Sequence, residues 1–229
     1  VSDVNAFKWV QQLRYYWEDD TVIVRSINNS YEYSYEYAGN SARLVITPLT
    51  DRCYQTLLSA FKQNLSGAPS GPAGTGKTET VRDCAKALGR PCVVYNCSEE
   101  VTPEQMSQFF AGLSSSGSWS CFDEFNRINI EVLSVIAQQV RNIQTAIAAN
   151  AETFQLDERT LKLNVNAAIC ITMNPGYAGR TELPDNLKAL FRPCAMMVPD
   201  FQFICEILLF SGGFKTASNL SVKLVALFD

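Results

Sequence analysis

The segment GPAGTGKT at residues 71–78 constrains the fold of this chain more than any other stretch. It matches G-x-x-x-x-G-K-[ST], a loop whose glycines let backbone N–H groups approach phosphate oxygens. A helix with one apolar face is predicted at 78–88 and ends at Gly89, and its positive end suits an anion. We therefore predict a nucleoside triphosphate site. Its predicted residues are Gly71, Pro72, Ala73, Gly74, Thr75, Gly76, Lys77, Thr78 and Glu79.

Composition excludes several classes of function. Apolar residues make up 47% of the 229 residues and charged residues 18%, as in a folded globular protein. The net charge of −4 argues against a nucleic-acid partner. No apolar run approaches the roughly 18 residues of a membrane span, and no secretory signal opens the chain. We expect neither nucleic acid nor a membrane as a partner.

The chain contains no histidine, which excludes Ser-His-Asp triads, Cys-His dyads and His-bearing zinc sites. Its 8 cysteines form no C-x-x-C pair and lie mostly in apolar runs, which favours buried thiols in a reducing compartment over disulfides. Any catalysis must use carboxylates, lysine, arginine and a metal ion.

Short apolar segments alternate with amphipathic helices, a pattern that predicts an α/β fold with a parallel sheet flanked by helices. The predicted strands lie at 91–96, 119–124, 167–173 and 194–198. The predicted helices lie at 103–112, 130–149, 185–191, 201–210 and 216–228, with a loop at 114–118 and a β-hairpin at 154–164. Ligands of such sheets bind at the carboxyl ends of the strands.

The first 38 residues are rich in aromatic side chains. Helical spacing from Phe7 to Trp17 predicts a helix, followed by strands at 21–27 and 31–37 with a turn at 28–30. The pattern fits an ordinary subdomain edge and a docking surface equally well.

An apolar segment at 43–49 precedes a predicted helix for which Thr50 is the expected N-cap. This segment can form an adenine pocket, and the alternative is plain core packing. The predicted pocket residues are Leu44, Val45, Ile46, Pro48 and Leu49.

Two carboxylates follow the predicted strand at 119–124. Asp123 can hold Mg²⁺ together with Thr78. Glu124 is suited to orient and deprotonate an attacking water, which a hydrolase needs and a nucleotide switch does not. The alternative is a solvated acidic turn.

Three further polar residues are candidates for the same site. Asn174 can contact the γ-phosphate or the attacking water, because an amide both donates and accepts; the alternative is a turn residue before Pro175. Asn96 is placed to hydrogen-bond Glu124, or else only caps its strand. Of the two arginines that follow, Arg180 and Arg192, the second is the candidate to serve a neighbouring subunit's site; the alternative is a surface ion pair.

With these residues assembled, the chain resembles the AAA+ ATPases and, more narrowly, the first AAA+ module of dynein heavy chains. The resemblance covers nearly the whole chain and reads as more axonemal than cytoplasmic. The segments that carry it most strongly are GPAGTGKTET (71–80), CFDEFNRI (121–128), ITMNPGYAGR (171–180) and LPDNLKALFRP (183–193).

The resemblance implies roles for these residues. Lys77 and Thr78 would belong to Walker A, Asp123 and Glu124 to Walker B, and Asn174 to sensor I. Asn96 would be the polar partner of the glutamate. Residues 1–38 would be the C-terminal end of the linker, 39–199 the large α/β subdomain, and 200–229 the start of a truncated helical lid.

The implied activity is that of a Mg²⁺-dependent ATPase in a minus-end-directed microtubule motor, whose ATP cycle drives linker movement and microtubule release. Implied partners are other AAA+ modules in a ring, the linker and tail, microtubules through a stalk outside these residues, and dynein intermediate and light chains. The implied location is a ciliary or flagellar axoneme. Alternatives are a non-motor remodelling ATPase and a regulatory module that holds ATP without turnover.

The chain has no initiator methionine and ends within an apolar-periodic segment, so we expect it to be a piece of a longer protein. The resemblance places the lid's sensor II arginine and the neighbour's arginine finger outside this piece. By itself the piece is therefore expected to bind nucleotide weakly and hydrolyse it very slowly.

Overall fold

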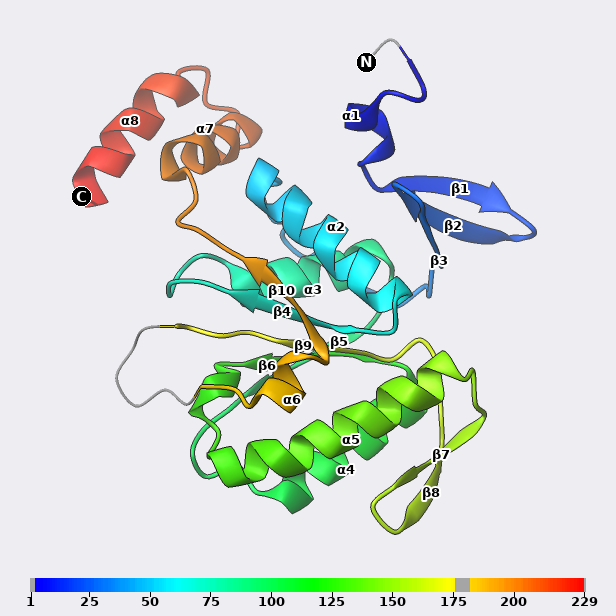
Figure 1. The fold of residues 1–229 in the computed structure, drawn as a ribbon. Helices are drawn as coiled ribbons and strands as arrows, with labels where there is room; N and C mark the ends of the chain where they lie inside the picture. The colour runs from blue at the N-terminus through cyan, green and yellow to red at the C-terminus, as the bar shows by residue number, and fades with distance from the viewer. Residues whose placement is uncertain (1–2, 176–181, 229) are drawn as a thin grey trace.

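The computed structural model describes residues 3–175 and 182–228, which form a five-stranded parallel sheet with helices on both faces (Figure 1). The strand order is β10-β4-β9-β6-β5. The predicted fold class, a parallel sheet flanked by helices, is confirmed. The strands are β4 (Ser66–Ser70), β5 (Cys92–Asn96), β6 (Trp119–Asp123), β9 (Ala168–Ile171) and β10 (Phe191–Ala195).

Two helical layers cover the sheet. Figure 1 shows α2 (Pro48–Lys62) and α3 (Lys77–Ala87) on one face, with α4 (Pro103–Ser116) and α5 (Ile130–Ala148) on the other. Side chains alternate along each strand, so Cys121 packs in the cluster under α2 and α3 whereas Phe122 packs under α4 and α5. Burial on both faces explains why the inner strands β6 and β9 are apolar runs.

Strand β4, which leads into the phosphate loop, was not predicted. Its sequence SGAPS has no β-branched or aromatic residue, so it carries no strand signal. Most of it is nevertheless buried, because α2 packs directly against it. A Cβ on Gly67 would lie 2.3 Å from Cδ2 of Leu57, so this packing requires a very small residue.

The amino-terminal segment forms a separate antiparallel sheet after a short helix, α1 (Phe7–Val10). Its strands are β1 (Arg14–Glu18), β2 (Thr21–Ser26) and β3 (Asn29–Glu32). The predicted helix up to Trp17 is wrong beyond Val10, because the aromatic run in β1 pairs with β2. The predicted strand at 31–37 also ends early, at Glu32.

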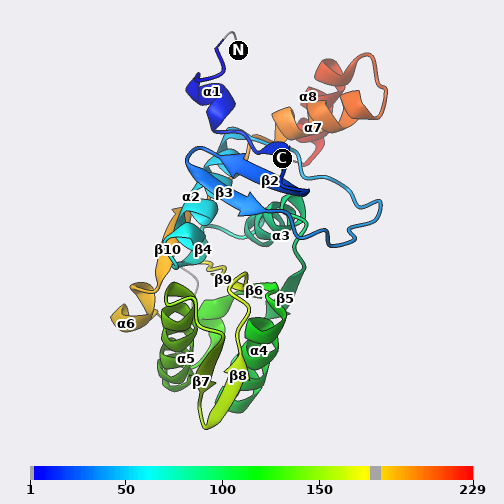
Figure 2. The ribbon, with the colours of Figure 1, turned by 90° about the vertical axis from the view of Figure 1, so that its right-hand side faces the viewer.

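This small sheet is attached to the main domain through buried contacts. Val24 is fully buried and packs in one cluster with Leu58, Leu88 and Trp119. The backbone N–H of Ser34 donates to the carbonyl of Leu88 over 3.0 Å. Figure 2 shows the sheet lying over the α2–α3 side of the molecule.

Three element boundaries differ from the prediction for local reasons. Helix α2 begins at Pro48 with Thr47 as its N-cap, and Thr50 is the third helical residue of a capping box. Helix α4 continues through its serines to Ser116 and ends at Gly117 with φ 76°. Helix α6 (Asp185–Lys188) is shorter than predicted, because β10 begins at Phe191.

Two hairpin-like units project from the domain. The predicted hairpin forms as β7 (Thr153–Leu156) and β8 (Arg159–Lys162) and packs against α5 and α4. Helices α7 (Phe201–Ser211) and α8 (Ala217–Phe228) pack on each other, away from the sheet (Figure 2). Among the helices of residues 3–175 and 182–228, none has the length and apolar character needed to cross a bilayer.

Candidate nucleotide site

The phosphate loop connects the end of β4 to the start of α3. Gly74 and Gly76 have φ of 75° and 78°, values that favour glycine, and Gly76 is the residue immediately before the helix. A Cβ on Gly71 would lie 2.0 Å from the carbonyl oxygen of Met196, so the base of the loop touches the chain just after β10. Gly74 and Gly76 therefore have the conformation that glycine favours, whereas the φ of Gly71 is not positive and that glycine is required by close packing.

Lys77 is buried in this loop, with 6% of its surface exposed. Its Nζ donates to the carbonyl oxygens of Gly71 and Pro72 over 3.0 and 2.6 Å, and to the Thr75 hydroxyl over 3.4 Å. Burial lowers the pKa of Lys77, and the nearby carboxylates oppose that shift. No carboxylate of the described chain forms an ion pair with Lys77. A buried ammonium held by neutral oxygens fits an anionic ligand such as a triphosphate.

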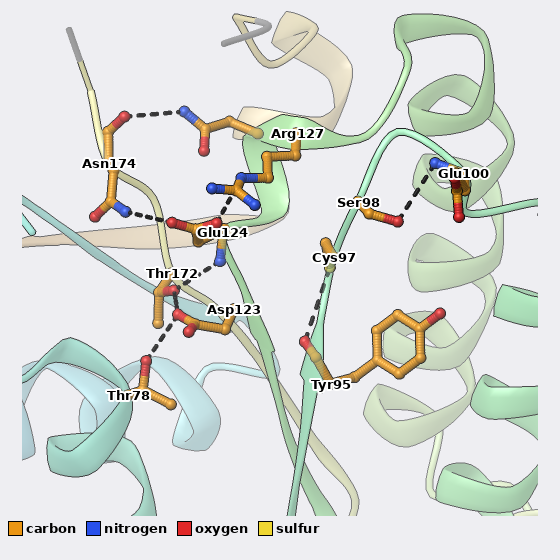
Figure 3. A network of polar contacts seen from close by, with 11 residues as sticks. Thr78, Tyr95, Cys97, Ser98, Glu100, Asp123, Glu124, Arg127, Thr172 and Asn174 are labelled. Carbon is orange, nitrogen blue, oxygen red and sulfur yellow. Dashed lines mark hydrogen bonds and ion pairs between the residues drawn. The ribbon is translucent and has the colours of Figure 1, made fainter. Parts of the chain in front are cut away.

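The first turn of α3 meets the end of β6 through Thr78 and Asp123. The Thr78 hydroxyl donates to Oδ1 of Asp123 over 2.7 Å (Figure 3). Within the described part of the chain, no group of three or more acidic, cysteine or histidine side chains could hold a metal. A hydroxyl and a carboxylate fit Mg²⁺, which takes few protein ligands and completes its shell with water and substrate phosphates.

Thr172, which sequence reasoning missed, links the two neighbouring carboxylate residues. Its hydroxyl donates to Oδ1 of Asp123 and accepts from the backbone N–H of Glu124 over 3.1 Å (Figure 3). The available signal was its position, because it directly follows Ile171, the last residue of β9. From sequence alone, a threonine at this position is interpreted as one more residue of the strand. Its contacts with Asp123 and Glu124 are seen only in the folded structure.

Glu124 lies just past β6 with φ 53°, in the left-handed region. Its Oε1 accepts from Nδ2 of Asn174 over 3.1 Å, and its Oε2 lies 2.5 Å from Nε of Arg127 (Figure 3). Asn174 is 8% exposed, and its Oδ1 is buried with no hydrogen-bond partner in the described chain. The predicted pair of Glu124 and Asn174 is therefore adjacent in space, although the two residues are 50 positions apart.

The other polar candidates lie farther from this pair. Asn96 is at the end of β5, opposite Asp123, and its side chain is exposed. Within the described chain, no hydrogen bond joins its side chain to Glu124, so its role as the glutamate's partner stays a prediction. Arg192 lies within β10 and not before it, opposite Gly67, with an exposed side chain. Arg180 lies outside the described residues.

An apolar pocket of about 440 Å³ lies between the start of α2 and the segment that joins β10 to α7. Of the five predicted adenine-pocket residues, Pro48 and Leu49 line it, whereas Leu44, Val45 and Ile46 do not. Its other wall was missed because it comes from a distant part of the sequence. The complete lining is Thr47, Pro48, Leu49, Arg52, Met197, Val198, Pro199, Asp200 and Phe203.

This pocket is connected to the phosphate loop through Met196. The carbonyl of that residue touches Gly71, and the next residue along the chain, Met197, lines the pocket. An apolar pocket beside a phosphate cradle suits the base of a nucleotide.

Comparison with known proteins agrees with a nucleotide-binding site in this chain. The family described as "Hydrolytic ATP binding site of dynein motor region" matches residues 33–229. Dynein axonemal heavy chain 3 of Homo sapiens is 59% identical over 228 residues, covering 100% of this chain and 6% of that protein. Dynein axonemal heavy chain 12 of Mus musculus is 61% identical, covering 98% of this chain and 7% of that protein.

A third relative, dynein axonemal heavy chain 1 of Homo sapiens, is 57% identical over 228 residues, which are 100% of this chain and 5% of that protein. The chain therefore spans only a small part of the length of these relatives.

Proposed function

The chain belongs to the dynein heavy-chain family, and on that premise we propose that it is the module of an axonemal-type microtubule motor that binds and hydrolyses ATP. The observation that carries this proposal is the meeting of Glu124, Asn174 and the phosphate loop at one edge of the sheet. A loop alone would support binding without turnover. The second carboxylate beside the loop favours hydrolysis over a regulatory module.

The binding residues have distinct tasks in this proposal. Backbone N–H groups of the loop and the ammonium of Lys77 bind the phosphates, and Lys77 exchanges its present carbonyl contacts for phosphate oxygens. Thr78 and Asp123 would hold Mg²⁺. When bound, this ion neutralises charge between the β- and γ-phosphates. Pro48 and Leu49 would contact the adenine base.

Glu124 is the proposed general base. It orients a water molecule for in-line attack on the γ-phosphorus and accepts a proton from it. Asn174 helps because Nδ2 holds the Glu124 carboxylate, while Oδ1, which has no hydrogen-bond partner among the described residues, would accept a hydrogen bond from the water. The bond from the γ-phosphorus to the bridging oxygen then breaks, which leaves ADP and inorganic phosphate.

The wider organisation is proposed from the family. Residues 1–38 would be the end of the linker, 39–199 the large subdomain and 200–229 the start of the lid. The ATP cycle would move the linker and release the motor from microtubules. The partners would be further AAA+ modules, the tail, and intermediate and light chains, and Arg192 would serve a neighbouring site. The location would be the axoneme of a cilium or flagellum. The linker-like residues 1–38 favour a motor over a non-motor remodelling ATPase.

Two variants in the full-length protein test the proposed hydrolysis. Lys77→Ala is expected to lose nucleotide binding, whereas Glu124→Gln is expected to bind ATP normally and lose turnover by at least 100-fold, roughly the contribution of a general base. Lys86→Ala, at the other end of α3, and Glu131→Gln, on the exposed start of α5, are matched controls. Wild-type turnover in Glu124→Gln would refute the proposal.

A further inference from the structure

The short turn η1 (Phe125–Arg127) directly follows Glu124 and contacts both members of the proposed catalytic pair (Figure 3). Nε of Arg127 lies 2.5 Å from Oε2 of Glu124. The side-chain Nδ2 of Asn126 donates to the backbone carbonyl of Asn174 over 3.2 Å. One turn therefore holds the carboxylate of the first residue and the backbone of the second.

Within residues 3–175 and 182–228, the Glu124 carboxylate is contacted from two different elements. Asn174, which follows β9, donates to Oε1 over 3.1 Å, while Arg127 contacts Oε2. The backbone of Glu124 is fixed separately, because its N–H donates to Thr172 and its φ of 53° lies in the left-handed region. Of these two contacts to the carboxylate, the one to Arg127 carries a full opposite charge.

We propose that Arg127 is a positioning residue for ATP hydrolysis, which holds Oε2 of Glu124 so that the carboxylate keeps the orientation needed to act on water. This inference rests on the proposed role of Glu124 as the base. A guanidinium suits the task because it is permanently charged and its planar donors have fixed directions. In this role Arg127 acts through its contact with Glu124.

Because the Arg127–Glu124 pair is partly exposed, its loss is expected to affect kcat more than stability. The side chains of Arg127 and Glu124 are 46% and 27% exposed, so water screens the pair and little stability depends on it. A base, by contrast, must be placed accurately, since small misplacements cost a large part of the rate. Loss of Arg127 is therefore expected to lower kcat with little change in stability or in KM for ATP.

The test compares Arg127→Gln and Arg127→Lys with wild type in the full-length protein. Arg127→Gln is expected to lower kcat roughly tenfold with KM for ATP within about twofold of wild type. Arg127→Lys keeps the charge and is expected to recover part of that loss. Lys188→Gln is the matched control, because Lys188 on α6 also forms an exposed ion pair, with Glu182 at 2.6 Å and with 44% of its own side chain exposed.

A double variant distinguishes positioning from a general structural role. If Arg127 acts through Glu124, then adding Arg127→Gln to Glu124→Gln produces no further loss in single-turnover rate. A wild-type or raised kcat in Arg127→Gln, a rise in KM that accounts for the whole effect, or an additive loss in the double variant would overturn the inference. Each of these outcomes leaves the proposed hydrolysis intact as long as Glu124→Gln alone is stalled.

Discussion

The Thr78 hydroxyl donates a 2.7 Å hydrogen bond to Oδ1 of Asp123, which joins the first turn of α3 to the end of β6. The two residues are 45 positions apart, and the parallel sheet brings them together because β4 and β6 end at the same edge. This contact marks the place where the phosphate loop meets the carboxylates.

Removing the Thr78 hydroxyl is expected to raise the Mg²⁺ concentration that nucleotide binding requires. Thr78→Val keeps the shape of the side chain but takes away the oxygen that would ligate the ion, while Thr78→Ser restores it. The measurement is a titration of Mg²⁺ against a fluorescent ATP analogue, with at least a tenfold shift expected for Thr78→Val, or about 1.4 kcal/mol. An unchanged titration in Thr78→Val would contradict the assigned ligand.

Thr172 is expected to matter for both stability and turnover. Thr172→Val removes the hydroxyl that donates to Asp123 and leaves the Glu124 N–H without its acceptor. The free energy of unfolding should fall by about 1–3 kcal/mol, the cost of an unsatisfied buried group, and kcat should fall with it. Chemical denaturation and steady-state kinetics measure the two effects. Thr172→Ser is the control, and equal losses in both variants would contradict the role of the hydroxyl.

Two glycines of the phosphate loop are required for different reasons, Gly71 by close packing and Gly74 by its backbone conformation. Gly71→Ala places a Cβ 2.0 Å from the Met196 carbonyl oxygen. At position 74 a Cβ would meet nothing within 4 Å, but the alanine backbone would have to adopt a φ of +75°. Gly74→Ala should cost about 1–2 kcal/mol of unfolding free energy from its backbone conformation alone. Gly71→Ala should cost more, because backbone must move, and thermal unfolding of both variants measures the difference. A smaller loss for Gly71→Ala would contradict the packing described.

The sequence predicted the elements of this sheet whose patterns are local. Helices α3 and α5 carry regular apolar spacing, and strands β6 and β9 are apolar runs, so their positions were predicted to within a few residues. Strand β4 was missed because Gly67 is required by its close packing against Leu57 on α2. This is a tertiary contact that no local sequence pattern shows. The spacing of aromatic residues before Trp17 is also typical of a helix, but residues 14–18 form strand β1, which pairs with β2.

The site divides in the same way. Lys77, Thr78, Asp123 and Glu124 stand in motifs and were identified from them, and Asn174 was identified from its place after a strand. Thr172, Asn126 and Arg127 lie within the segments that carry the resemblance, but no role was predicted for them. Their contacts with the site come from the structure, as do those of Met197 and Val198 with the apolar pocket.

Cys97, beside the site, is expected to resist alkylation in the folded protein. Burial, followed by the carboxylates of Asp123 and Glu124, raises the pKa of its thiol to about 12, so the reactive thiolate forms only in strongly alkaline solution. Labelling with iodoacetamide at pH 8 should therefore be slow in the native state and fast in urea, where the thiol is exposed. Mass spectrometry of the Cys97 peptide measures both rates, and equal rates would contradict its burial.

The central claim, that Glu124 completes a hydrolysis site on a nucleotide-binding loop, is tested most directly by identifying the bound nucleotide after a single turnover. Wild-type full-length protein and Glu124→Gln are mixed with a substoichiometric amount of labelled ATP and quenched after several wild-type turnover times. The account predicts ADP and phosphate from wild type and intact, bound ATP from Glu124→Gln. Recovery of ADP from Glu124→Gln at the wild-type rate would contradict it.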